Sequence, residues 1–168
     1  MLFRIRGTVF RGILATAGFL LAHSTASVGQ QFDPPTYEDD PRLLILKSFL
    51  DRYGSPAASL ADEFLEAADR NDLDWRLLPG IAIVESGGGK TSENNNIFGW
   101  DSGRIDFTTV EDGIHFVAYR LANSKLYRDK QLNAVLLTYN PYPDYPARVR
   151  SVMRRLGPPR VRAYRSAE

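Results

Sequence analysis

The sequence predicts a mainly α-helical domain, on three observations. Most of the chain after residue 41 divides into segments whose apolar residues recur at helical spacing. Several of these segments begin at a residue that favours a helix N-terminus, such as Ser55 or Thr109. Apart from a few residues around Ile105, no stretch alternates apolar and polar side chains as a half-buried strand does.

Composition limits the kinds of chemistry that the chain can use. Its 168 residues suffice for one domain with a hydrophobic core, and 43% apolar and 24% charged residues are typical of a globular protein. The chain contains no cysteine. Disulfides, thiol nucleophiles and cysteine-ligated metal sites are therefore excluded.

Residues 1–29 have the three-part layout of a secretory signal peptide. Arg4, Arg6 and Arg11 precede the apolar run GILATAGFLLA, and small residues follow at cleavage spacing. The run is short for a membrane span. We therefore expect an exported protein, located in the periplasm, in the cell wall or outside the cell. An uncleaved N-terminal anchor is the alternative.

Charge is unevenly distributed along the rest of the chain. Residues 30–41 are predicted to form an acidic, Pro-rich linker, and residues 158–168 a basic tail. Without the three arginines of the signal, 18 basic residues stand against 20 acidic ones, a net charge near −2. From Arg148 to Arg165 the chain carries seven arginines and no acid. In an exported protein this cluster favours contact with an anionic envelope surface over nucleic acid, and a solvated helix face with a loose tail is the simpler interpretation.

Three helices are expected before the middle of the chain. The first lies in PRLLILKSFLDRYG and ends at Gly54. Ser55 as N-cap and Pro56 at the first helical position begin the second. Asp74 caps the third, which contains the apolar run LLPGIAIV and ends near Ser86.

A long loop and three further helices follow. Residues 86–107 are rich in Gly, Ser and Asn and predict a loop with at most a short hairpin, and loops of this length are usually functional. Thr109 caps the next helix. Another helix lies in KQLNAVLLTYN, and the last begins after Asp144 and ends at Gly157.

The segment IVESGGGKTSENNNIFGW contains GGGKT, which is similar to the end of a phosphate-binding loop. A P-loop, however, has a glycine six residues before its lysine, and Val84 stands there relative to Lys90. A helix also precedes this loop, where a P-loop follows a strand. The sequence therefore excludes a nucleotide-binding P-loop.

Glu85 is the candidate for catalysis in this segment. Its neighbours on the same helix face are Leu78, Ile81 and Ala82, so its carboxyl group would be partly desolvated. Desolvation favours the protonated form that a general acid needs. The three glycines that follow leave room for a large substrate. The alternative is that Glu85 is a surface residue at a frayed helix end.

Other site chemistries have little support. After the signal the chain has one histidine, His115, which we expect to be structural. A serine-hydrolase elbow is absent, and DSGRID lacks the ligand spacing of an EF-hand. We expect neither a metal nor a cofactor.

Three motifs, taken together, resemble the glucosaminidase and lytic transglycosylase families of the lysozyme-like fold. The first is Glu-Ser at the end of an apolar helix, and the second is Asn-Asn-Ile-Phe-Gly about ten residues later. The third, LLTYNPYPDYPARVRSVM, is similar to a segment that these families place across the cleft, and Tyr145 in it is the least certain match. The resemblance covers about residues 58–156. The matched positions are Glu85, Ser86, Asn95, Asn96, Phe98, Gly99, Tyr139 and Asn140.

The resemblance implies a lysozyme-like glucosaminidase domain at residues 42–157, acting as a monomer on β-1,4 bonds between N-acetylglucosamine and N-acetylmuramic acid in peptidoglycan. Glu85 would be the general acid, and Tyr139 would stabilise an oxocarbenium-like state. The remaining matched residues would bind substrate: Ser86, Asn95, Asn96 and Asn140 through polar groups, Phe98 and Gly99 as the floor of the cleft. For Phe98 and Tyr139, core packing is the alternative.

The sequence departs from the family at the second carboxylate. Only WDSGRIDFT separates Gly99 from Thr109, and Glu93, Asp101 and Asp106 are the available acids. A single acid favours lytic transglycosylation, or help from the substrate's acetamido group, over two-carboxylate hydrolysis. A non-catalytic module that binds wall glycan or scaffolds an envelope complex is the alternative. A protein-binding site formed by the GRID segment and the basic tail is a weaker one.

Overall fold

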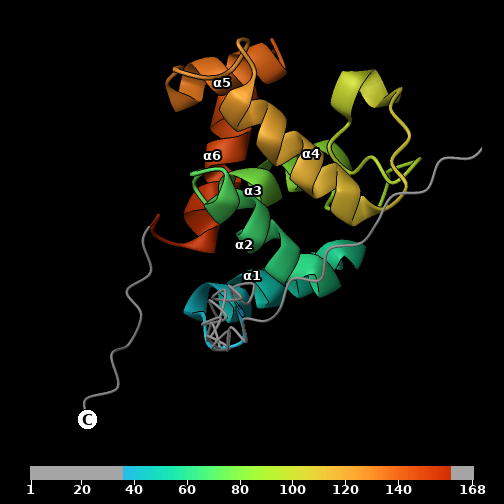
Figure 1. Cartoon of the computed structure of the whole chain (residues 1–168), viewed down its shortest axis with the longest axis vertical. Coiled ribbons are helices and arrows are strands. Elements are labelled where there is room, and N and C mark those ends of the chain that lie inside the picture. The colour runs from blue at the N-terminus through green and yellow to red at the C-terminus, as the bar shows by residue number, and fades with distance from the viewer. Residues whose placement is uncertain (1–35, 160–168) are drawn as a thin grey trace, which may run out of the picture. The chain divides into compact units, whose positions relative to one another are not determined.

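Six α-helices account for most of the chain that the computed structural model describes, residues 36–159 (Figure 1). No strand occurs in this range, so the mainly α class is confirmed and the hairpin around Ile105 is absent. The predicted signal peptide and most of the basic tail lie outside the described residues. The helices are α1 (Pro41–Arg52), α2 (Ala61–Arg70), α3 (Leu77–Ser86), α4 (Val110–Asn123), α5 (Leu132–Tyr139) and α6 (Tyr145–Leu156), with short 3-10 helices η1 (Pro56–Leu60) and η2 (Trp100–Gly103).

The predicted helix starts are mostly correct. Ser55 accepts a hydrogen bond from the backbone of Ala57, although the turn that it caps is the 3-10 helix η1 and α2 begins later. Thr109 caps α4 by accepting from Asp112 N at 3.0 Å. Asp144 precedes α6 as predicted but makes no capping bond with its side chain.

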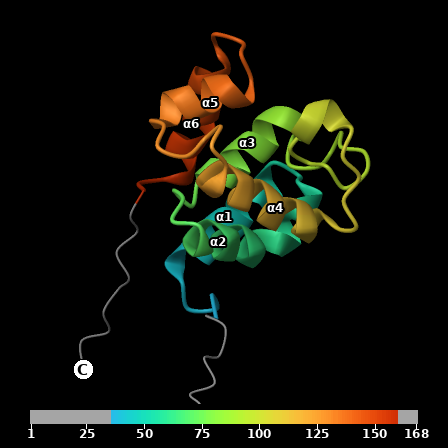
Figure 2. The same cartoon turned by 45° about the horizontal axis from the view of Figure 1, so that its top comes forward.

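The third helix forms the centre of the packing. Every residue from Leu77 to Ala82 is buried, as expected for a helix that is apolar on all sides. It packs mainly against α6, while α2 packs against α1 and α4 (Figures 1 and 2). Gly80 permits the close approach of α6, because a Cβ atom there would lie 3.2 Å from Met153 and 3.3 Å from Val149. This packing fixes the end of α3, where Glu85 lies, relative to α6.

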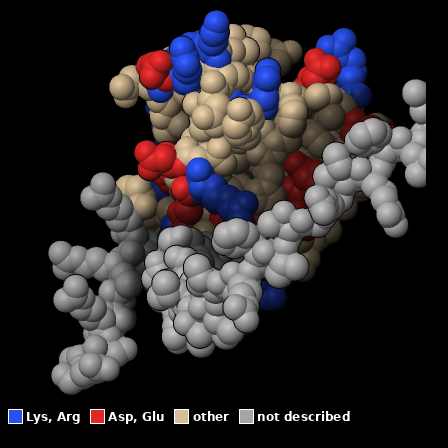
Figure 3. Space-filling view, in the orientation of Figure 1, with Lys and Arg blue, Asp and Glu red and all other residues tan. Residues whose placement is uncertain are grey.

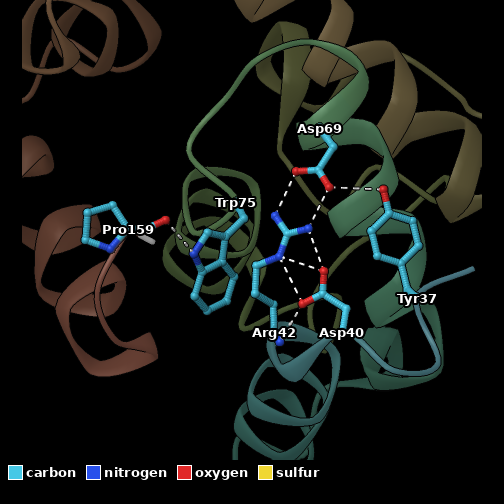
Figure 4. Close-up of polar contacts among 6 residues, drawn as sticks. All are labelled: Tyr37, Asp40, Arg42, Asp69, Trp75 and Pro159. Carbon is cyan, nitrogen blue, oxygen red and sulfur yellow. Dashed lines mark hydrogen bonds and ion pairs between the residues drawn. The ribbon is translucent and has the colours of Figure 1, made fainter. Parts of the chain in front are cut away.

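The folded unit begins earlier than the predicted linker allows. Tyr37 is buried and its hydroxyl donates to Asp69 of α2, and Asp40 caps α1 (Figure 4). Arg42 joins them with ion pairs of 2.7 Å to both Asp40 and Asp69. The predicted boundary at residue 42 is therefore too late, since residues 37–41 belong to the packed domain.

The end of the described chain is also held. Trp75, which is buried, donates its indole N–H to the carbonyl of Pro159 at 3.1 Å (Figure 4), and Arg76 donates to the carbonyl of Gly157.

On the face seen in Figure 3, both acidic and basic side chains are present, and a large area of uncharged residues separates them. None of the described helices has the length and apolarity needed to span a membrane.

Candidate active site

Glu85 lies in the last turn of α3, and glycines end the helix directly after it. Gly87 adopts a left-handed conformation with φ of 65°, and the amides of Gly87 and Gly88 bond to the carbonyls of Ile83 and Ala82. Gly88 is in turn fixed by Ser55, whose hydroxyl donates to its carbonyl at 2.6 Å. The chain therefore turns sharply away after Glu85 and leaves its side chain at the edge of a hollow.

That hollow is a cleft of about 780 Å³. Glu85 forms one part of its wall, and the loop from Gly99 to Ile105 forms another. Helix α4 contributes Phe116 and Arg120, and the end of α5 with the turn after it contributes residues 139–142. Segments that are distant in sequence thus meet around the carboxylate of Glu85, as expected for a ligand site.

The carboxylate of Glu85 is only partly in contact with the cleft. Its Oε1 atom is buried and, among the described residues, has no hydrogen-bond partner. Oε2 lies close to Gly99, where a Cβ atom would be 3.2 Å away. Glycine at position 99, with φ of 59°, therefore keeps the approach to the carboxylate open.

Two stacked tyrosines lie next to Glu85. The rings of Tyr139 and Tyr145 are nearly parallel, with centroids 6.0 Å apart. The hydroxyl of Tyr145 is buried beside the Glu85 carboxylate, but the contact does not reach hydrogen-bond geometry, and this hydroxyl has no other partner in the described range. Burial first, and the Glu85 carboxylate second, raise the pKa of Tyr145 well above its ordinary value. Tyr145 is therefore neutral, with a hydroxyl group that can act as a hydrogen-bond donor to Glu85.

Tyr139 is held more firmly than Tyr145. Its hydroxyl donates to the carbonyl of Phe98 at 2.6 Å, which ties α5 to the loop that carries Gly99. Burial, and then the charge of Glu85, raise the pKa of Tyr139. Its hydroxyl hydrogen is already engaged, so Tyr139 can offer an oxygen lone pair and a ring face to a bound molecule.

An aromatic cluster centred on Trp100 lines the cleft. The indole ring packs edge-on against Phe116 at 5.8 Å and against Tyr139 at 5.6 Å, and lies 6.0 Å from Tyr127. Tyr142, 69% exposed, stands at the rim. Such amphipathic aromatic surfaces suit the flat, partly apolar faces of sugar rings.

The structure brings half of the predicted site residues to the cleft. Glu85, Gly99, Tyr139 and Asn140 line it. Ser86, Asn95, Asn96 and Phe98 do not, and their predicted contacts with substrate are corrected as follows.

Ser86 and Asn96 are structural residues. The buried hydroxyl of Ser86 donates to the carbonyl of Ile97 at 2.6 Å and accepts from Gly89 N at 2.8 Å. The buried amide of Asn96 binds the backbone of Trp100 on both its oxygen and its nitrogen, and also the carbonyl of Ile105. Their polar atoms therefore fold the loop and are not available to a ligand.

Asn95 and Phe98 have related roles. The amide nitrogen of Asn95 donates to the carbonyls of Phe107 and Thr108, which fastens the loop to the start of α4. The ring of Phe98 is fully buried in the core, edge-on to Phe64 at 6.3 Å. The ring of Phe98 therefore packs in the core, which was the alternative to a contact with substrate. Only its backbone carbonyl contacts a cleft residue, Tyr139.

Of the three acids considered as catalytic partners, only Asp101 lines the cleft, because Glu93 and Asp106 are exposed outside it. The carboxylate of Asp101 is paired with Arg104 at 2.5 Å. Glu85 is therefore the one carboxylate lining the cleft, within residues 36–159, that has no cationic partner.

Sequence reasoning missed several cleft residues. Trp100 and Phe116 lie in the centre of the aromatic cluster, and Arg120 and Tyr142 lie at its edges. Phe116 and Arg120 are one turn apart on α4 and outside its buried face, which Ile114, Val117 and Leu121 form. A second functional face could have been inferred from this spacing. Nothing in the sequence pattern singles out Trp100.

Among the described residues, one group of side chains has ligand atoms close enough together to hold a metal ion, and it lies outside the cleft. Ligand atoms of Glu63, Glu111 and His115 fall within 4.8 Å of one another. The imidazole of His115 is 2.8 Å from Glu63, and this contact joins α4 to α2. We interpret the group as a polar contact between two helices, in agreement with the structural role expected of His115.

Comparison of the chain with models of protein families, with curated proteins and with solved structures found no match.

Proposed function

We propose that the protein is an exported glycosidase that cleaves the β-1,4 glycan bonds of peptidoglycan, as an endo-β-N-acetylglucosaminidase or a lytic transglycosylase of the lysozyme-like superfamily. The observation that carries the proposal is Glu85, an unpaired and half-buried carboxylate in an aromatic-walled cleft. The ordered motifs around Glu85, Gly99 and Tyr139 support the substrate, and the signal-like N-terminus supports export.

In this proposal Glu85 protonates the glycosidic oxygen of the leaving sugar. Tyr145 stabilises the glutamate after it has lost its proton, because its neutral hydroxyl can turn to donate to the carboxylate. Tyr139 faces the developing positive charge at the anomeric carbon with its oxygen and its ring. Trp100 and Tyr142 carry neighbouring sugars on their faces.

The scarcity of carboxylates favours lytic transglycosylation within this class. A hydrolase of the two-carboxylate type needs a second free acid across the scissile bond. Asp101, the other acid lining the cleft, is paired with Arg104. An attack by the substrate's own hydroxyl group needs no such residue, since Glu85 can give and take the proton in turn.

Digestion of purified peptidoglycan followed by mass spectrometry of the released fragments tests the proposal. Anhydro ends would identify a transglycosylase, and reducing ends a hydrolase. We expect Glu85→Gln to lower the rate of release about 10²-fold to 10⁴-fold, the usual contribution of a general acid. Glu93→Gln, an exposed glutamate in the same loop, is the matched control and should retain full activity.

A non-catalytic glycan-binding module is the second candidate. Most glycosidases use two carboxyl groups, and the described cleft has one that is unpaired. It predicts that the wild-type protein sediments with peptidoglycan and releases no fragments. Full activity in Glu85→Gln would reject the assignment of the acid, whichever bond is cut.

A further inference from the structure

A second hollow, of about 340 Å³, lies along the groove between α3 and α6. Its apolar part is formed by Ile83, Val84 and Val152, and Ser151 adds a hydroxyl group. Two cations, Arg148 and Arg155, border it from α6. The groove thus combines alkyl surface with positive charge, a combination that differs from the aromatic cleft.

This groove adjoins the Glu85 site. Val84 directly precedes Glu85 on α3, and Arg148 follows Tyr145 by one turn on α6. Arg148 is close enough for its charge to oppose the rise in the pKa of Tyr145 that burial and Glu85 cause. A polymer bound over Glu85 could bring its side branches to the groove by passing Val84.

Arg155 is held in place without being neutralised. The guanidinium group of Arg155 lies over the ring of Tyr53, 5.4 Å from its centroid. Lys90 donates to the backbone carbonyl of the same tyrosine at 2.7 Å, which brings a third cation to this edge. Neither Arg148 nor Arg155 forms an ion pair with any carboxylate of residues 36–159.

We propose that the groove between α3 and α6 binds the acidic peptide stems of the peptidoglycan strand, through Arg148 and Arg155. The inference rests on the proposed function, and it names the form of the substrate: peptide-bearing strands rather than bare glycan. Arg148 and Arg155 are seven residues apart, about 10 Å along the helix. A single phosphate group is too small to contact both arginines across that distance, whereas two carboxylates on one short peptide could contact one arginine each. The alkyl side chains of the peptide would then cover Val84 and Val152.

Kinetics on two forms of one substrate test the proposal. Peptide-bearing strands are compared with the same strands after an amidase has removed their peptides. We expect the wild-type protein to have the lower KM on peptide-bearing strands, with a preference that weakens as salt is added. Arg155→Gln should raise the KM on peptide-bearing strands about fivefold, the upper range for an exposed ion pair, with little change in kcat.

Matched variants separate charge from structure. Arg154→Gln removes a neighbouring exposed arginine that lines neither hollow and should leave the KM unchanged. Arg155→Lys keeps the charge and should recover most of the lost preference. Circular dichroism spectra identical to that of the wild-type protein would show that each variant is folded.

A direct binding measurement distinguishes failure of the inference from failure of the proposed function. The free acidic tetrapeptide, titrated into the protein, should shift the NMR signals of Val84 and Ser151, and it should do so less in Arg155→Gln. Equal KM values on the two substrates, with cleavage that still depends on Glu85, would overturn the inference and leave the function intact. Peptide binding without cleavage of any strand would instead reject the function and support the groove as a binding site.

Discussion

At the scale of single residues, the relation between Glu85 and Tyr145 decides what the cleft can do. Each side chain has a buried oxygen without a hydrogen-bond partner in the described range, and the two groups face each other. Buried polar groups that are unpaired cost stability, and natural folds keep few of them. Such a pair is expected beside a carboxylate that changes its protonation state during catalysis, because a permanent strong bond would fix the glutamate in one protonation state.

We predict that Tyr145→Phe lowers activity without lowering stability. The lost hydroxyl makes no hydrogen bond, so the free energy of unfolding should stay within about 1 kcal/mol of the wild-type value or rise. Release of glycan fragments should fall at least tenfold in kcat, because the carboxylate that Glu85 becomes during catalysis then lacks the hydroxyl that can turn to donate to it. Urea unfolding and initial rates measure the two effects separately.

The pH profile gives a further check on Tyr145→Phe. In the proposed mechanism Glu85 acts in its protonated form, so its loss of a proton limits activity on the alkaline side of the profile. Because the hydroxyl of Tyr145 would stabilise the ionised carboxylate, the alkaline limb of the profile should move to higher pH in the variant. A large loss of stability with an unchanged profile would show that Tyr145 serves only the core.

At the scale of elements, the sequence predicts helices well and the loop between α3 and α4 poorly. Helix starts follow from local chemistry, as at Thr109, whose hydroxyl caps α4 in the predicted way. The loop depends on residues that adopt left-handed conformations without being glycine, among them Asn94, Asn95 and Asp101. Distant contacts, such as that of Asn95 with Phe107, decide these conformations, and no local pattern encodes them.

The same distinction explains which of the predicted site residues lie at the cleft. Glu85 could be located because its helix has a clear apolar pattern and a glycine stop. Asn96 and Ser86 carry hydrogen-bonding groups that suit a sugar or a backbone equally well. Only the folded loop shows that both point inward.

We predict that glycine is needed at position 88 for steric reasons as well as for its backbone conformation. Gly54 and Gly88 have similar φ angles, 61° and 73°, so alanine at either should cost about 1 kcal/mol in backbone strain. At Gly88 the new Cβ atom would also lie 2.4 Å from the hydroxyl oxygen of Ser55, whereas at Gly54 it meets nothing within 4 Å.

The two glycine variants therefore form a matched pair. Gly88→Ala should destabilise the protein by about 3 kcal/mol or more, since relief of the clash breaks the bond from Ser55 to the Gly88 carbonyl. Gly54→Ala should cost about 1 kcal/mol. Urea unfolding measures both, and equal losses would show that the loop shifts freely and does not fix the end of α3.

At the scale of the whole molecule, side-chain contacts attach the two ends of the described chain to the helical core. Tyr37 and Arg42 fasten the first residues to α2 through Asp69, and Trp75 holds the last ones through Pro159 (Figure 4). These contacts are distant from the cleft. They stabilise the core against which α3 positions Glu85, so conditions that weaken them should lower stability before they alter the site.

Alkaline pH is such a condition, because Tyr37 must remain protonated to donate to Asp69. Burial, and then the charge of Asp69, raise the pKa of Tyr37 to about 12 in the folded protein. In the unfolded chain the value is about 10. A group whose pKa is raised by folding stabilises the protein fully below its unfolded pKa, and that stabilisation is lost as the pH rises toward the folded value.

We predict that the free energy of unfolding falls between pH 10 and 11 by about 1 kcal/mol through Tyr37 alone. Tyr139 and Tyr145 add to the loss, since burial raises their pKa values too. Tyr37→Phe has no group to titrate at this position and should show a smaller fall than the wild-type protein over the same interval. Urea unfolding at pH 8, 10 and 11 measures the difference. Parallel curves for the two proteins would mean that the hydroxyl of Tyr37 does not hold the N-terminal segment, and that the burial of its ring alone makes residues 37–41 part of the domain.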